Sequence, residues 1–91
     1  TEKKGELSEQ ELEELNAGIQ ILLERISERP TVVITYFVPD KKKAGGSYQT
    51  ITGRVRWLDE YNQRLCLEDG KNIPLGDIAE FDFPEMKNNE L

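Results

Sequence analysis

The chain has 91 residues, a 36% hydrophobic fraction and a net charge of −6, which allows one domain with a modest core. It has no histidine and a single cysteine, Cys66, so an internal disulfide is excluded and neither a zinc site nor a nucleophile–histidine pair is expected. No apolar run reaches membrane-spanning length, and the start does not resemble a signal peptide. We therefore expect a cytoplasmic protein without a metal or cofactor.

The negative charge is unevenly distributed along the chain. Residues 1–29 hold four basic and eight acidic side chains, whereas residues 30–91 hold eight basic and ten acidic ones. Non-specific binding of nucleic acid depends on clustered lysine and arginine side chains that neutralise phosphates. We therefore expect nucleic acid to bind only weakly or indirectly, and a protein to be the main partner.

A helix is predicted at residues 8–28, after a flexible N-terminus at 1–7. The sequence after Ser8 forms a capping box, in which the Ser8 hydroxyl accepts from the Glu11 N–H while the Glu11 carboxylate accepts from the Ser8 N–H. Pro30 ends the element, because the residue before a proline avoids the helical region. Such a helix is longer than a small barrel is wide, so one end is expected to project.

One face of this helix is apolar, and we expect it to pack across the barrel and close its open end. The same spacing also fits the heptad seam of a homodimer, and both interpretations stay open. The apolar stripe consists of Leu12, Leu15, Ile19, Leu22, Leu23 and Ile26. Ile21 lies about half a turn from the stripe. Because it is flanked by the small residues Ala17 and Gly18, these three residues are the predicted contact with a protein partner.

The rest of the chain predicts five short antiparallel strands with a one-turn element between the last two. The strands are expected at 32–38, 48–58, 64–68, 71–75 and 79–83. Ile51, Val55 and Trp57 alternate with polar residues, which places all three side chains in the core. Gly53 falls on the same side, where a missing side chain lets a strand bend. Phe37, Phe81 and Phe83 complete the predicted aromatic core.

Turn residues separate these strands. Asp59 and Asn62 lie in the first turn after the long strand, and Asp69 with Gly70 forms the next. Pro74 cannot donate to a strand ladder, which favours an edge position. The predicted fold class is α+β: an N-terminal helix followed by a five-stranded antiparallel Sm-like or SH3-like small barrel. One domain spans 8–83, with the barrel at 31–83 and a flexible tail at 84–91.

The joint order of these segments resembles the YolD-like family of Gram-positive bacteria, their plasmids and phages. The segments that carry the resemblance are TVVITYF, ITG, WLDEYNQRLCLEDG and IPLGDI, with Leu7-Ser8-Glu9-Gln10 at the helix start. Ser8 stands where the family often has Asp, and the resemblance covers residues 7–83. Because the family usually carries a further basic N-terminal segment, we expect this sequence, which starts at Thr1, to be a trimmed form.

The resemblance implies a function without catalysis. YolD-like proteins are thought to be accessory subunits of Y-family, UmuC-like translesion DNA polymerases in the SOS response, a role likened to that of UmuD. No Ser/Lys self-cleavage pair is recognisable in this chain, so autoproteolysis is not expected. A plasmid or phage adapter with an unrelated partner stays open as an alternative.

No catalytic constellation is visible among the residues. Cys66 lies in a strand pattern without an activating base, which favours a structural thiol. The carboxylates near turns are expected to accept hydrogen bonds from local backbone rather than to form a paired-carboxylate site. These are Asp59, Glu60, Glu68, Asp69 and Asp77.

A second function class is an Sm-like oligomer that binds RNA or single-stranded DNA. Its contacts would come from Lys41, Lys42 and Lys43 in the first hairpin loop, together with the tyrosines. Gly53 and Asp59 have the spacing of the Gly and Asp in the first Sm motif. However, the following Asn comes one residue too early, and the second Sm signature is absent, so the resemblance supports the fold more than the activity.

Overall fold

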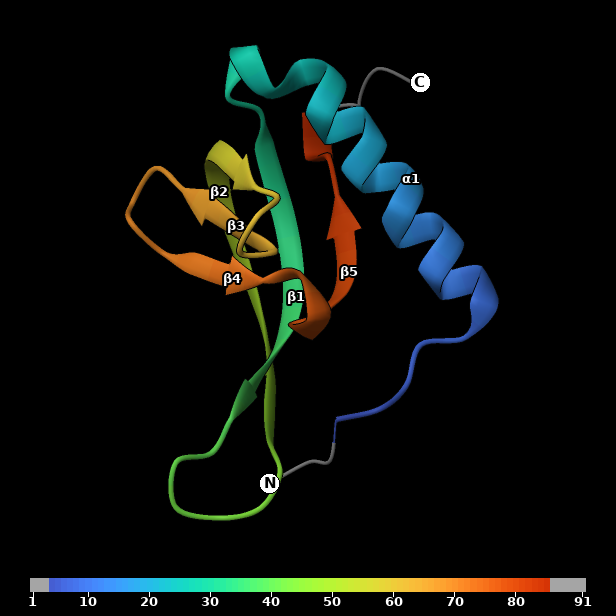
Figure 1. The fold of residues 1–91 in the computed structure, drawn as a ribbon, viewed down its shortest axis with the longest axis vertical. Helices are drawn as coiled ribbons and strands as arrows, with labels where there is room; N and C mark the ends of the chain where they lie inside the picture. Colours follow the sequence, from blue (N-terminus) through green and yellow to red (C-terminus); the bar gives the residue numbers. More distant parts are fainter. Residues whose placement is uncertain (1–3, 86–91) are drawn as a thin grey trace.

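The computed structural model describes residues 4–85 and consists of one long helix followed by a five-stranded antiparallel sheet (Figure 1). The helical elements are α1 (Glu9–Arg25) and the one-turn elements η1 (Ile26–Glu28) and η2 (Leu75–Asp77). The strands are β1 (Thr31–Pro39), β2 (Gly46–Asp59), β3 (Arg64–Leu67), β4 (Asn72–Pro74) and β5 (Ile78–Asp82). The predicted α+β class and element order are confirmed. Within the ends predicted to be flexible, residues 1–3 and 86–91 lie outside the described part.

Both ends of α1 follow from local residues. The capping box is present, with Glu11 N donating to Ser8 Oγ at 3.1 Å and Ser8 N donating to Glu11 Oε1 at 2.9 Å. The α-helix ends at Arg25, and η1 completes the predicted span as a tighter 3₁₀ turn, as is common at helix C-termini. Arg29 then adopts a left-handed conformation with φ of 49°, which turns the chain toward Pro30 and β1.

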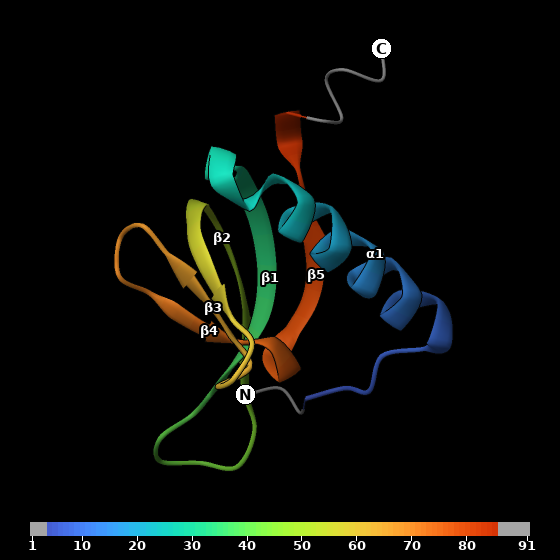
Figure 2. The ribbon, with the colours of Figure 1, turned by 45° about the horizontal axis from the view of Figure 1, so that its top comes forward.

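The sheet has the strand order β4-β3-β2-β1-β5, so β4 and β5 are its two edges. β2 belongs to both halves of the sheet, because it pairs with β1 up to Arg54 and with β3 from Val55 onward. Gly53 lies at this change of partner, where an added Cβ would already be 3.4 Å from Leu67 Cδ1. Figure 2 shows that β3 and β4 turn away from the plane of β1 and β5. The described strands therefore form a curved but open sheet.

The hydrophobic core lies between α1 and the inner face of the sheet. Leu22 is the α1 side chain that is completely buried there, and Phe37 and Phe83 are also buried, as predicted. The core cluster is formed by Leu22, Val32, Ile34, Val55, Leu65, Leu67, Ile73, Ile78 and Phe83. Leu15 and Ile26 from the predicted stripe pack against this cluster, whereas Leu12 is 45% exposed. The N-terminal part of α1 thus contributes less to the core than its centre.

The prediction that Trp57 is a core residue was wrong, because its side chain is 48% exposed. A bulge between Val55 and Trp57 shifts the pairing of β2 with β3 by one residue, so strict alternation breaks at this point. Trp57 then pairs with Cys66, whose neighbours Leu65 and Leu67 belong to the core cluster. Since paired residues of antiparallel strands share a face, Trp57 and the buried Cys66 lie together on the outer face.

This arrangement predicts a modest cost and a chemical consequence for Trp57→Ala. The free energy of unfolding should fall by about 1–2 kcal/mol, because only about half of the Trp57 side chain is buried in the wild type and the substitution removes only those contacts. The Cys66 thiol should react much faster with a thiol reagent such as dithionitrobenzoate once the neighbouring ring is removed. Tyr61→Ala is the control, since Tyr61 is 94% exposed. If the Cys66 thiol reacted equally fast in the wild type, Trp57→Ala and Tyr61→Ala, the shielding of Cys66 by Trp57 would be contradicted.

Candidate functional site

A glycine stands where α1 comes closest to β5. A Cβ at Gly18 would lie 3.0 Å from Phe81 Cδ1 and 3.7 Å from the Phe81 carbonyl oxygen, so a larger residue here would require the Phe81 side chain to shift. Phe81 pairs with the fully buried Ile34 and therefore belongs to the inner face of the sheet. Because Gly18 and Leu22 are both buried and lie one turn apart, this side of α1 packs against the inner face of the sheet.

A groove of about 590 Å³ lies between α1 and β5, and we call it the β5 groove. Its helix wall consists of Glu11, Glu14, Leu15, Ala17, Gly18 and Ile21. Its strand wall consists of five consecutive residues: Ala79, Glu80, Phe81, Asp82 and Phe83. The structure therefore brings the three predicted partner contacts together in one groove, next to residues that were not selected from the sequence.

The helical spacing predicts that Ile21 lies opposite the core, but the structure places it on the core side. It is half-buried and packs against the core cluster, on the same side of α1 as Gly18, which lies three positions earlier and approaches Phe81. An Ile21→Asp substitution would therefore destabilise the fold as well as any complex, and it is unsuitable as a test of partner binding. The partner role of Ala17, Gly18 and Ile21 itself stays a prediction.

Acidic residues line the β5 groove on both walls, and those of β5 alternate with the inward-facing Phe81 and Phe83. Glu11 and Glu14 come from the first turns of α1, and Glu80 and Asp82 come from β5. The backbone N–H of Ser8, followed by its hydroxyl, lowers the pKa of Glu11, which keeps this carboxylate ionised. The alternation of acidic and aromatic residues in the segment 80–83 is the sequence signal that could have identified the strand wall.

A second groove, of about 480 Å³, lies on the other side of α1. Its apolar lining combines helix residues that were expected in the core with residues near the end of β2 and in η2. These residues are Leu12, Leu15, Ile19, Leu23, Leu58, Leu75 and Ile78. Leu22 is fully buried within its own chain, so a homodimer seam along α1 would have to form without it. The homodimer therefore stays a prediction, and Leu22 is removed from its predicted contacts.

Lys41, Lys42 and Lys43 lie in the loop of the β1–β2 hairpin, which projects from the body of the protein (Figure 1). All three side chains are exposed. Asp40 Oδ1 accepts from the backbone N–H groups of Lys42 at 2.8 Å and Lys43 at 3.2 Å, which orders the start of the loop. The lysines are therefore far from the β5 groove and form a separate candidate surface.

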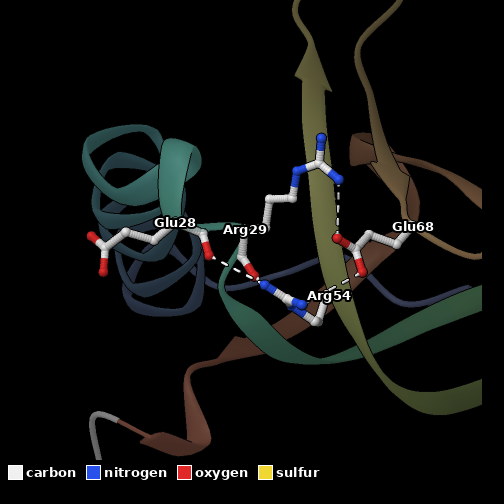
Figure 3. A network of polar contacts seen from close by, with 4 residues as sticks. All are labelled: Glu28, Arg29, Arg54 and Glu68. Carbon is white, nitrogen blue, oxygen red and sulfur yellow. Dashed lines mark hydrogen bonds and ion pairs between the residues drawn. The ribbon is translucent and has the colours of Figure 1, made fainter.

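An arginine network that the sequence did not reveal joins the end of the helical segment to the sheet (Figure 3). Arg54 on β2 donates from Nε to the carbonyl oxygen of Arg29 at 3.0 Å and from Nη2 to that of Glu28 at 3.5 Å. Glu68 accepts from Arg29 Nη1 at 3.2 Å and lies 3.9 Å from Arg54 Nη1. These contacts are exposed and position η1 rather than stabilise the fold strongly.

The turn after β2 is organised by Asp59, whose side chain is buried. Asp59 accepts from the Asn62 N–H at 3.0 Å, from Asn62 Nδ2 at 2.8 Å and from Arg64 Nε at 3.1 Å. The Asn62 bonds, assisted by the Arg64 guanidinium, lower the pKa of Asp59 below its ordinary value of 3.8. The predicted local role of Asp59 as a turn carboxylate is confirmed.

The lowered pKa predicts how Asp59 affects stability in acid. Because the folded pKa lies below the unfolded one, the stabilisation is fully present above the unfolded value and is lost as the pH falls through the folded value. Asp59→Asn should therefore be less stable than the wild type at neutral pH and should lose less further stability between about pH 5 and pH 2. Unfolding midpoints across this range measure the effect. Identical pH dependence in Asp59→Asn and wild type would contradict it, and Glu60→Gln is the neighbouring control.

The other chemistry-bearing side chains do not converge. Cys66 is buried in β3. Glu68 contacts the arginines, Asp69 accepts from the Lys71 N–H at 2.9 Å, and Asp77 pairs with Lys4 at 2.9 Å. Within residues 4–85 no group of three or more His, Cys, Asp or Glu side chains could hold a metal ion. In the same part of the chain, no helix combines the length and apolarity needed to cross a membrane.

Comparison with known proteins identified no relative of this chain. No family model, no curated protein and no solved structure matches the chain. The function is therefore argued from the residues, the geometry of the β5 groove and the resemblance of the sequence segments.

Proposed function

We propose that this protein is a non-catalytic, cytoplasmic adapter that binds a protein partner through the β5 groove. The observation that carries this proposal is the groove itself, which is lined by acidic residues of α1 and β5 together with the apolar residues Leu15, Ile21 and Phe81. Mixed apolar and charged surfaces of this kind are typical of protein interfaces. The acidic charge favours association with a basic surface by steering the encounter.

The proposed partner is a Y-family, UmuC-like translesion DNA polymerase. This part of the proposal rests on the resemblance of residues 7–83 to YolD-like proteins. A DNA polymerase carries basic surfaces to hold the phosphate backbone, and an acidic adapter is complementary to such a surface. The adapter would act in the SOS response by binding the polymerase rather than by performing chemistry.

The finer fold assignment is also a proposal. A helix, five antiparallel strands and the one-turn element η2 between β4 and β5 together resemble the Sm-like and SH3-like barrels. The change of partner strand along β2 next to Gly53 supports this class, because a glycine allows the curvature with which small sheets begin to close. The fold alone carries no activity.

Co-purification tests the proposed partner. The tagged full-length protein is recovered from DNA-damaged cells of a Gram-positive host that encodes a UmuC-like polymerase, and from undamaged cells as the control. We expect the polymerase to be enriched after damage, and the two purified proteins to form a complex in size-exclusion chromatography. Absence of a complex between the purified proteins would contradict the polymerase assignment.

The projecting hairpin favours nucleic-acid binding as the second candidate function. Only Lys41, Lys42 and Lys43 form its basic cluster, so we expect labelled single-stranded RNA or DNA to bind with a Kd weaker than about 10 μM at physiological salt. A triple Lys→Ala variant of the loop should then change little, and Lys71→Ala is the control outside it. Micromolar or tighter binding that only the triple variant loses would instead support the Sm-like function.

A further inference from the structure

The edge of β5 is open toward the β5 groove. β5 is the terminal strand of the described sheet and pairs only with β1 among the described strands. In an antiparallel pair, alternate residues point their backbone N–H and C=O groups away from the partner strand. The groove is lined by consecutive residues from Ala79 to Phe83, whose side chains alternate between the two faces. The groove therefore follows the backbone edge of β5 rather than one face of the sheet.

The helix forms a second wall beside this edge, with the β5 groove between them. The two walls come closest where Gly18 meets the inner-face side chain of Phe81. Leu15 and Ile21 on the helix and Phe83 directly after β5 give the groove an apolar lining. An added strand could place apolar side chains against these residues while its backbone pairs with β5.

The charges on the two walls determine what such a strand carries. Glu11 and Glu14 line the helix side, and Glu80 lies on the strand side, where it alternates with the inward-facing Phe81 and meets the outward-facing side chains of an added strand. A second copy that pairs through its own β5 is a poor occupant, because pairing of two β5 edges would bring acidic side chains of both copies together. Lysine or arginine side chains, alternating with apolar ones, complement both walls.

We propose that the β5 groove binds an extended, basic segment of the partner protein, which adds to β5 as a further antiparallel or parallel strand. This inference rests on the proposed adapter function and specifies how its partner is recognised. Backbone hydrogen bonds to β5 supply the affinity, and the acidic walls select basic segments over neutral or acidic ones.

A peptide of alternating lysine and valine, seven residues long and blocked at both ends, is the probe. Titration into the ¹⁵N-labelled protein should shift the amide signals of residues 79–83 and of the facing side of α1. The same peptide with every peptide nitrogen methylated keeps its charge but cannot donate to β5, so it should bind at least about ten-fold more weakly. Equal binding of both peptides, or shifts located elsewhere, would overturn the proposal.

A matched pair of charge reversals separates the groove from general electrostatics. Glu14→Lys with Glu80→Lys changes the groove, whereas Glu13→Lys with Glu24→Lys makes the same change in net charge at exposed glutamates outside it. The groove variant should bind the peptide at least about ten-fold more weakly, and the control variant should stay within about three-fold of the wild type. Equal weakening in both variants would overturn the proposal.

The same variants distinguish this inference from the proposed function. If the polymerase binds the wild type and the groove variant equally well, the adapter function holds and the strand-docking inference fails. If the peptide binds in the groove but no polymerase complex forms, the docking inference holds and the polymerase assignment fails. A dimer in sedimentation that the peptide does not dissociate, with no peptide shifts in the groove, would show that a second copy occupies it and would overturn the inference.

Discussion

Leu22→Ala is expected to lower the free energy of unfolding by about 2–5 kcal/mol, the range for removing a buried leucine side chain and leaving a cavity. Leu22 is fully buried and is the α1 residue that enters the core cluster. A domain of this size has a total stability of only about 5–15 kcal/mol. The variant should therefore unfold at a much lower urea concentration, as followed by circular dichroism.

Leu12→Ala is the matched control, because it removes the same atoms from the same helix at a side chain that is 45% exposed. Its cost should be below about 1 kcal/mol, as expected for a position near the surface. A similar loss of stability in the two variants would contradict the assignment of Leu22 as the residue that attaches α1 to the sheet. Loss of the helix in Leu22→Ala would in turn remove the helix wall of the β5 groove.

Local signals in the sequence were sufficient to predict the elements of the fold. The capping box at Ser8 identified the start of α1, and the turn at Asp59 identified the end of β2; both are set by residues within three positions of each other. The five strands were predicted because short alternating segments are separated by Gly, Asp and Pro. Such features depend on neighbouring residues and need no knowledge of the tertiary structure.

The features that the sequence did not predict depend on contacts between distant segments. The bulge that exposes Trp57 is a property of the pairing between β2 and β3, and no residue type in β2 requires it. Ile21 packs against the core on the side of α1 where Gly18 meets Phe81, a residue more than sixty positions away. The link from Arg54 to Arg29 spans 25 positions. Helical spacing alone therefore assigned Ile21 to the wrong side of α1.

The helix wall of the candidate site was predicted from residues close together in the sequence, whereas its strand wall depends on distant segments and was not. Ala17, Gly18 and Ile21 were selected as one cluster, and the structure does place them in one groove. The strand wall of that groove could not be assigned from the sequence, because it requires knowing that β5 is an edge and that α1 lies beside it. An edge strand and a central strand of this length have similar patterns, and only the pairing distinguishes them.

Gly46→Ala is expected to disrupt the projecting β1–β2 hairpin. An added Cβ would run into the carbonyl oxygen of Val38 and would lie 2.8 Å from Pro39 Cα and 2.9 Å from Phe37 Cζ. Two of these three atoms belong to the backbone, so they cannot move aside by a change of rotamer. The strands must separate, and we expect a cost of about 1–3 kcal/mol, typical of overpacking.

The consequences of this separation should be local. The pairs Val38↔Ser47 and Pro39↔Gly46 would be lost first, together with the edge-to-face contact of Phe37 with Tyr48 at 5.3 Å. Tyr48 also accepts a hydrogen bond from the Gly5 N–H at 2.9 Å, so the segment before α1 should loosen as well. Amide hydrogen exchange should accelerate at residues 38–48 and at Gly5 more than in β3.

Gly76→Ala is the control for this experiment, since nothing lies within 4 Å of a Cβ added at Gly76. Its stability and exchange pattern should stay close to those of the wild type. If Gly46→Ala left exchange in the hairpin unchanged, the close approach of β1 and β2 at this point would be contradicted. If it accelerated exchange throughout the sheet, the hairpin would be part of the cooperative core rather than a projecting arm that can open by itself.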